Sequence, residues 1–450
     1  MLGSAPVELA PFLSSDDPVT RDLANGLIWM ESVLGSEAVA TRIRQQAELR
    51  GPSPRETFDT LSAGATQDLF GWQLFNCHAF LFDPTTYDTN AGARIVPTVV
   101  ALGARAPVLA KIPGAADRLR ASAEGASNFE KTAFELLVAA AYAASGWLPE
   151  FVPPSALAKT PELQTKSPVN GERVFVECKR LSKNSGYAQL EREKWMRLVQ
   201  PVALHMRKRA LPVLLDIVFH TELVGLPDDY LETILAPKLE LAVPGLLVDS
   251  PDLTVSLRAT DLRPIQKEVE HSSIKTNGSR INHLVFGSYD PARGYHLLVG
   301  GQPNERHPLF MKTIDFAAGA VWSCDAARSH AAKARDIRSR LAEAVRQLPD
   351  GAPGVVHFAV ESYDGPTVER IRNQRITRTL GAFKTGKDLR VVYVHLLTFD
   401  SPPDMAWDMQ ETVYVTTFAP GAGATALDHE LSPYRLHNHH AWTFNGAAPG

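Results

Sequence analysis

The chain has 450 residues, of which 44% are apolar and 21% charged, a composition typical of a folded protein with two or three domains. Its formal net charge of −4 excludes binding to nucleic acid through bulk positive charge. The three cysteines lie far apart and form no CxxC pair, which argues against a structural zinc site or a disulfide framework and indicates a cytoplasmic protein. The apolar runs fall short of the roughly 20 residues of a membrane span, so we expect no membrane partner.

The N-terminal part of the chain, residues 1–125, predicts a helical accessory domain, because its apolar residues recur at helical spacing. The clearest helix follows at residues 128–145. Asn128 is placed as its N-cap, and Gly146 marks its end.

Residues 126–222 read as one α/β unit. Strands are predicted at 147–152, 161–164 and 173–179, with an Asn-Gly turn before the third, then a helix at 187–209 and a strand at 211–220. The predicted order is therefore helix, three strands, helix, strand.

The remainder of the chain divides into three regions. Residues 223–325 are expected to be rich in β-structure, with strands at 253–258, 281–287 and 295–300. Residues 326–419 form a C-terminal α/β region that extends the core sheet, with helices at 331–348 and 368–383 and strands at 355–360 and 389–399. Residues 420–450 are rich in Gly, Ala and Pro, which predicts a flexible tail.

Charged side chains end the strand predicted at 173–179. Because side chains on a strand alternate between its two faces, Glu177 and Lys179 share one face, while Val174, Val176 and Cys178 point into a core. Divalent magnesium prefers oxygen ligands, and a metal, an activated water and a stabilised leaving group are what phosphodiester hydrolysis needs. Two further carboxylates could approach this face. They are Glu162, on the preceding strand, and Glu135, on the helix before it.

Three short motifs occur in a fixed order: Phe134-Glu135 on the helix, Pro161-Glu162 on the second strand, and Glu177-Cys178-Lys179 on the third. Together they resemble the PD-(D/E)XK, or restriction-endonuclease-like, nuclease superfamily over residues 127–220. The resemblance implies a mixed α/β (α+β) fold with an αβββαβ core. The sequence departs from the family at Glu162, where the family usually has Asp and where Glu reaches one methylene further.

The resemblance also implies roles for these residues. Glu162 and Glu177 would bind Mg²⁺, or Mn²⁺ in its place, together with the backbone carbonyl of Cys178. Lys179 would orient or activate the attacking water and offset charge on the phosphate. Glu135 would bind a second metal or a metal-bound water.

Basic residues gather around the helix predicted at 187–209, where they favour contact with a phosphate backbone. The candidates for nucleic-acid binding are Arg180, Lys183, Arg192, Lys194 and Arg197. Gln200, on the same helix, is a candidate polar support for the site. A solvated helix face that is merely rich in arginine explains the same pattern.

The leading hypothesis is an Mg²⁺-dependent endonuclease that acts on DNA rather than RNA, in a setting that the resemblance associates with bacterial defence, mobile elements or repair. The outer regions, a second copy in a homodimer or a partner protein would direct it to its target. One alternative is a nuclease-like module that binds nucleic acid or protein without cleavage. Another is an α/β protein with no nucleic-acid partner, in which Glu177 and Lys179 only protect an edge strand.

Overall fold

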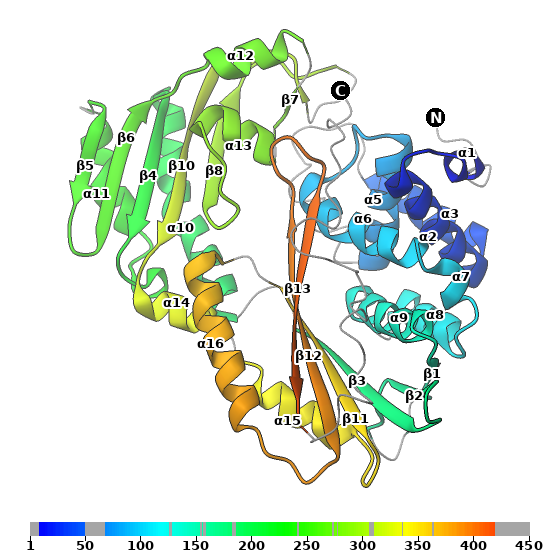
Figure 1. The fold of residues 1–450 in the computed structure, drawn as a ribbon. Coiled ribbons are helices and arrows are strands. Elements are labelled where there is room, and N and C mark those ends of the chain that lie inside the picture. Colours follow the sequence, from blue (N-terminus) through cyan, green and yellow to red (C-terminus); the bar gives the residue numbers. More distant parts are fainter. Residues whose placement is uncertain are drawn as a thin grey trace.

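Two mixed β-sheets organise the chain, and helices cover both faces of each (Figure 1). The structure is a computed structural model that describes residues 9–49, 68–125, 128–153, 155, 159–181, 186–240, 243–271, 274–276, 278–305, 310–334, 336–361 and 364–418. The predicted tail at 420–450 and Lys183 lie outside the described residues. The α/β class expected from the sequence is confirmed.

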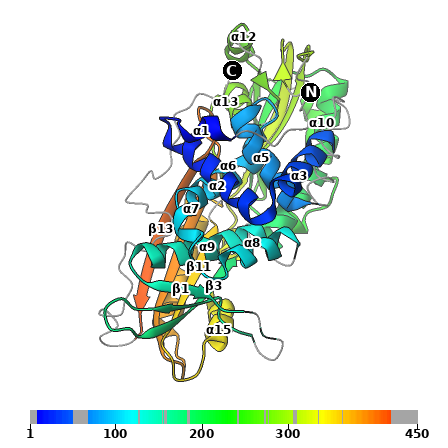
Figure 2. The same ribbon diagram turned by 90° about the vertical axis from the view of Figure 1, so that its right-hand side faces the viewer.

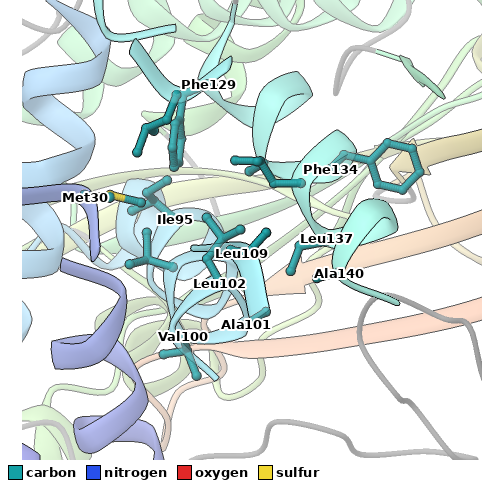
Figure 3. Packing of buried hydrophobic residues seen from close by; sticks show 14 of the residues in the cluster. Met30, Ile95, Val100, Ala101, Leu102, Leu109, Phe129, Phe134, Leu137 and Ala140 are labelled. Atoms are coloured by element: carbon teal, nitrogen blue, oxygen red, sulfur yellow. The ribbon is translucent and has the colours of Figure 1, made fainter. Parts of the chain in front are cut away.

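Helices form the N-terminal part of the chain. They are α1 (Ala10–Leu13), α2 (Pro18–Leu34), α3 (Ser36–Leu49), α5 (Leu69–Phe82), α6 (Thr89–Gly103), α7 (Ala106–Leu109) and α8 (Ala115–Ala123). Of these, α6, α7 and α8 pack against α9 (Phe129–Ala144). The N-cap of α9 is Asn128, as predicted: the backbone N–H of Glu130 donates to its side chain at 2.8 Å. Figure 3 shows side chains of α2, α6, α7 and α9 meeting in one buried cluster.

The first sheet holds the motifs of interest. Its strands, in order across the sheet, are β1 (Leu148–Phe151), β2 (Leu163–Lys166), β3 (Arg173–Leu181), β11 (Gly354–Glu361), β12 (Leu389–Asp400) and β13 (Asp408–Thr417). β3 pairs antiparallel with β2 and parallel with β11, so it is an interior strand. The alternative in which Glu177 and Lys179 lie on the exposed face of an edge strand is wrong, because Glu177 is fully buried.

Helices cover this sheet on both faces. α9 lies next to β1 and β3, and α8 packs against α9 (Figure 2). Val174, Val176 and Cys178 of β3 are buried in the same cluster as α9, as predicted. The opposite face packs against α15 (Arg338–Gln347) and α16 (Pro366–Ala382) through a separate apolar cluster. Strands covered in this way are apolar on both faces, which is typical of parallel strands in α/β proteins.

The second sheet is built mainly from the middle of the chain. Its strands, in order, are β5 (Gly245–Asp249), β6 (Leu253–Ala259), β4 (Val213–Phe219), β10 (Phe316–Cys324) and β8 (Gly294–Gly300). One face is covered by α10 (Gly186–Lys208) and α11 (Tyr230–Leu239), the other by α12 (Arg263–Val269) and α13 (Ser279–Phe286). Shorter elements are η1 (Leu223–Gly225), β7 (Ile274–Lys275), β9 (Phe310–Met311) and α14 (Ala327–Lys333).

β4, the strand expected to complete the unit at 126–222, belongs to the second sheet and not to the first. β4 pairs with β6 and β10 of the second sheet, and β11 takes the place beside β3. Along the chain, the elements of the first sheet run α9, β1, β2, β3, α15 and β11, with α10 to α14 between β3 and α15. The second sheet is inserted between β3 and α15. An apolar run predicts a buried strand without showing which strand it pairs with, and this caused the error.

Local predictions failed at other points. The strand expected at 281–287 is the helix α13, in which Ile281 and Val285 are buried four residues apart, the spacing of one helix face. The single helix expected at 331–348 is divided into α14 and α15. Strands β10 and β13 were not predicted. Within the described ranges, no helix combines the length and apolar character that crossing a membrane requires.

Candidate active site

Glu177 and Lys179 lie side by side on β3, as strand alternation predicted. Lys179 Nζ is 2.6 Å from Glu177 Oε1, and the side-chain amide of Gln347, the last residue of α15, donates to the same oxygen at 3.0 Å. Glu177 is fully buried, and its second oxygen, Oε2, has no hydrogen-bond partner among the described residues. Oε1 of this carboxylate thus has two donors, and Oε2 has none among the described residues.

Burial makes ionisation of Glu177 costly. It raises the pKa of this carboxyl from its ordinary 4.5 to about 7, even though Lys179 lowers it. The carboxylate of Glu162 raises the pKa further, so the two acidic groups are close enough to repel each other.

Glu162 reaches this place through the pairing of β2 with β3. Leu163 of β2 is paired with Val176 of β3, and Glu162 comes directly before Leu163 as Glu177 comes directly after Val176. Beyond this pair, positions 177–181 of β3 border only β11 among the described strands. Because β2 begins at Leu163, residues 177–181 of β3 have no neighbouring strand among the described strands on the side of Glu162.

Glu135, on α9, lies close to Glu162. Burial and the neighbouring Glu162 carboxylate raise the pKa of Glu135 to about 7. The pKa of the buried Cys178 thiol is likewise raised, first by burial and then by Glu135, Glu177 and Glu162 together. Glu162 is thus the carboxylate that lies near both of the others, while Glu135 approaches β3 from the face covered by α9 and Glu177 faces α15.

Two cations that sequence reasoning missed stand between Glu135 and Glu162. Lys131 Nζ is 3.2 Å from Glu135 Oε1 and 3.1 Å from Glu162 Oε1, while Arg118 Nη1 is 2.9 Å from Glu162 Oε2 and 3.8 Å from Glu135 Oε2. Lys131 is four residues before Glu135, a spacing that places both on one helix face and was a usable signal. Arg118 comes from α8, and no local pattern marks it.

The four predicted site residues are covered to different degrees. The side chain of Lys179 is 16% exposed, against 10% for Glu162, 3% for Glu135 and none for Glu177. Lys179 is accordingly the member that solvent reaches most easily. A phosphate can meet the carboxylates only if the side chains over them move.

Whether these residues suit a divalent metal depends on their donor atoms. Within the described part of the chain, no group of three or more His, Cys, Asp and Glu side chains is arranged as metal ligands, and Lys131 and Arg118 separate Glu135 from Glu162. The donor chemistry nevertheless fits Mg²⁺, which takes one or two carboxylates from a protein. The unpartnered Oε2 of Glu177 and the repulsion between Glu162 and Glu177 are both relieved by a cation.

Arg180, expected to contact nucleic acid, is committed to a buried ion-pair network instead. Its Nη2 is 2.6 Å from Glu361 Oε1, and Nη2 of Arg94 lies 2.7 Å from the same oxygen. Burial opposes the charge on Glu361, but Arg180 and Arg94 lower its pKa below the ordinary value. Because its guanidinium is needed to balance this carboxylate, the assignment of Arg180 to a phosphate is wrong.

The remaining basic candidates lie on α10, which packs against β10, β8 and α11 of the second sheet. Lys194 is buried and forms an ion pair with Asp228, and Arg197 Nε lies 3.5 Å from the same carboxylate. Arg192 is exposed on this helix. Gln200 is also exposed there and does not support the site; Gln347 of α15 is the amide that contacts Glu177.

Comparison with known proteins adds no assignment. No protein-family model, curated protein or solved structure matches the chain. The functional argument therefore rests on the geometry around Glu162, Glu177 and Lys179.

Proposed function

We propose that this chain is an Mg²⁺-dependent nuclease that hydrolyses phosphodiester bonds, in DNA rather than RNA. The observation that carries the proposal is the Glu177 carboxylate, which lies beside Lys179 and near Glu162 and whose buried Oε2 has no hydrogen-bond partner among the described residues. The order α9, β1, β2, β3, α15, β11 around them supports the resemblance to the PD-(D/E)XK superfamily.

Each residue has a chemical task in this proposal. Glu162 and Glu177 hold Mg²⁺, or Mn²⁺ in its place, and the metal when bound neutralises phosphate charge and makes water a better nucleophile. Lys179 orients the attacking water and offsets charge that develops on the phosphate. Gln347 fixes the Glu177 carboxylate through its hydrogen bond of 3.0 Å.

A second candidate function is a nuclease-like module that binds nucleic acid or protein without cutting. The observation that favours it is the cover over the site: Glu177 has no exposed surface, and Lys131 and Arg118 already pair with Glu135 and Glu162. In such a module the ion pairs would replace the metal, and added Mg²⁺ would have no effect.

Cleavage by a Lys179→Ala variant separates the two functions. We expect the wild-type chain to cut plasmid DNA with Mg²⁺ and not with EDTA, and the variant to cut roughly 10²–10⁴-fold more slowly, the usual contribution of a positioned proton-transfer group. Gel quantification of nicked and linear plasmid measures the rate, with an RNA transcript as second substrate.

Lys166→Ala is the matched control, since Lys166 is an exposed lysine on β2 and its loss should leave the rate unchanged. Absence of cutting with both Mg²⁺ and Mn²⁺, or equal rates for wild type and Lys179→Ala, would refute the nuclease proposal.

A further inference from the structure

A basic groove of about 850 Å³ lies between α15 and α16. Arg338 contributes from α15, Arg375 and Arg378 from α16, and Lys384 from the segment after α16. Asp336 is the acidic residue of the lining. Four cations from two helices and a connecting segment thus face one hollow.

The positive charge of the groove is not balanced locally. The carboxylate of Asp336 accepts hydrogen bonds from the Thr379 hydroxyl, at 2.7 and 2.9 Å, and from the backbone N–H of Ile337 at 2.7 Å. No carboxylate in the described ranges forms an ion pair with any of the four cations. A chain with a net charge of −4 therefore concentrates unpaired cations at this place.

One of the cations is held in position before any ligand arrives. Arg375 Nη1 donates to the backbone carbonyls of Ala331, at 2.7 Å, and Ala334, at 2.5 Å. A fixed guanidinium loses little freedom on binding, and its planar fork suits phosphate oxygens. Phe383, also in the lining, adds an apolar surface against which a sugar or base can pack.

Helix α15 connects the groove with the candidate active site. Leu341 and Val345 bury one side of this helix against the sheet, Arg338 and Ala342 line the groove, and Gln347 hydrogen-bonds Glu177. Arg338 and Gln347 are the first and last residues of α15, about 14 Å apart along its axis, so a strand bound at Lys179 reaches the groove by following α15.

We infer that the basic groove binds the phosphate backbone of a nucleic acid beside the bond that is cut, an inference that rests on the proposed nuclease function. The groove replaces the helix α10 as the surface that receives the strand. Several separate cations suit the repeated charges of a polymer, and the open hollow suits a chain that enters and leaves.

The test compares two triple variants of the full chain. The groove variant is Arg338→Ala with Arg378→Ala and Lys384→Ala, all exposed residues. The matched control removes three exposed lysines elsewhere, Lys111, Lys238 and Lys267, so that the net charge changes equally. Fluorescence anisotropy of a labelled DNA duplex, in EDTA and over a series of salt concentrations, gives the affinity without cleavage.

We expect the groove variant to bind roughly 10- to 100-fold more weakly than wild type, and its plot of log affinity against log salt to flatten by about 2 to 3 units, close to one for each lost phosphate contact. The control variant should lose much less. Equal affinities for the two variants overturn the inference. So does tighter binding of a labelled polyglutamate peptide than of DNA, because the groove would then serve an acidic protein partner.

The outcomes for the two proposals can be told apart because binding is measured without metal. Groove-dependent binding without any cleavage supports the groove and refutes the nuclease. Mg²⁺-dependent cleavage, together with unchanged DNA affinity in the groove variant, supports the nuclease and refutes the groove.

Discussion

The buried side chain of Glu177 lowers the stability of the folded protein at neutral pH. It is fully buried, and burial raises its pKa from the ordinary 4.5 to about 7. Between these two values the folded chain holds a proton that the unfolded chain releases, so the free energy of unfolding falls as the pH rises from 4.5 to 7. The site therefore costs stability at neutral pH, as is common where function requires buried charge.

A Glu177→Gln variant should lose this pH dependence. At about 1.4 kcal/mol per pKa unit, the loss of unfolding free energy between pH 4.5 and 8 should be smaller by roughly 3 kcal/mol than in the wild type. Urea denaturation in EDTA at both pH values measures it. Added Mg²⁺ should raise the stability of the wild type at pH 8 but not that of the variant.

Glu193→Gln is the control at an exposed site on α10, where the pH dependence should stay as in the wild type. Identical pH dependence of wild type and Glu177→Gln would show that burial does not hold a proton on this carboxyl.

Among the helices, α9 joins the N-terminal helices to the first sheet. Its side chains from Thr132 to Tyr142 are buried, and Figure 3 shows Phe134 and Leu137 within the cluster. Tyr142 shares a hydrogen bond of 3.3 Å between its hydroxyl and Nε2 of His357 on β11. The helix that carries Glu135 is thus fixed on one side by helices and on the other by the sheet.

A Phe134→Ala variant tests this dependence on α9. Phe134 has no exposed surface, so we expect truncation to cost roughly 3–5 kcal/mol of unfolding free energy, from lost burial and the cavity left behind. Denaturant unfolding followed by circular dichroism measures it. Leu190→Ala on α10, where the side chain is 51% exposed, should change stability by less than about 0.5 kcal/mol. Equal losses in the two variants would contradict the packing described for α9.

At the scale of the whole molecule, the first sheet is completed by strands that follow the second sheet in the chain. β3 at residues 173–181 pairs with β11 at 354–361, and the intervening chain contains β4 to β10. Contacts so distant in sequence carry a high entropic cost of loop closure, which the buried strands β11 and β12 must offset. The part of β3 that carries Glu177 and Lys179 therefore depends on the C-terminal part of the chain.

A fragment of residues 126–222, the unit that the sequence suggested, should not fold alone. Without β11 one side of β3 is unpaired, and β4 lacks both of its neighbours, β6 and β10. We expect its circular dichroism to show no cooperative unfolding transition, in contrast to the full chain. A cooperative transition in the fragment would mean that the pairing of β3 with β11 is dispensable.

The sequence by itself determined the features that depend on neighbours within a few residues. Helical spacing and a cap predicted α9, and strand alternation predicted that Glu177 and Lys179 share a face. The Asn-Gly turn between β2 and β3 was enough to predict that Glu162 lies near Glu177, because the pairing of Leu163 with Val176 brings the two positions together.

Only the tertiary structure decided which distant elements complete the site. β11 stands beside β3 instead of β4, Gln347 contacts Glu177 instead of Gln200, and Arg94 shares Glu361 with Arg180. These choices follow from which apolar faces are buried together and which charges are then left to be balanced. Periodicity along one segment contains no information about a partner more than a hundred residues away.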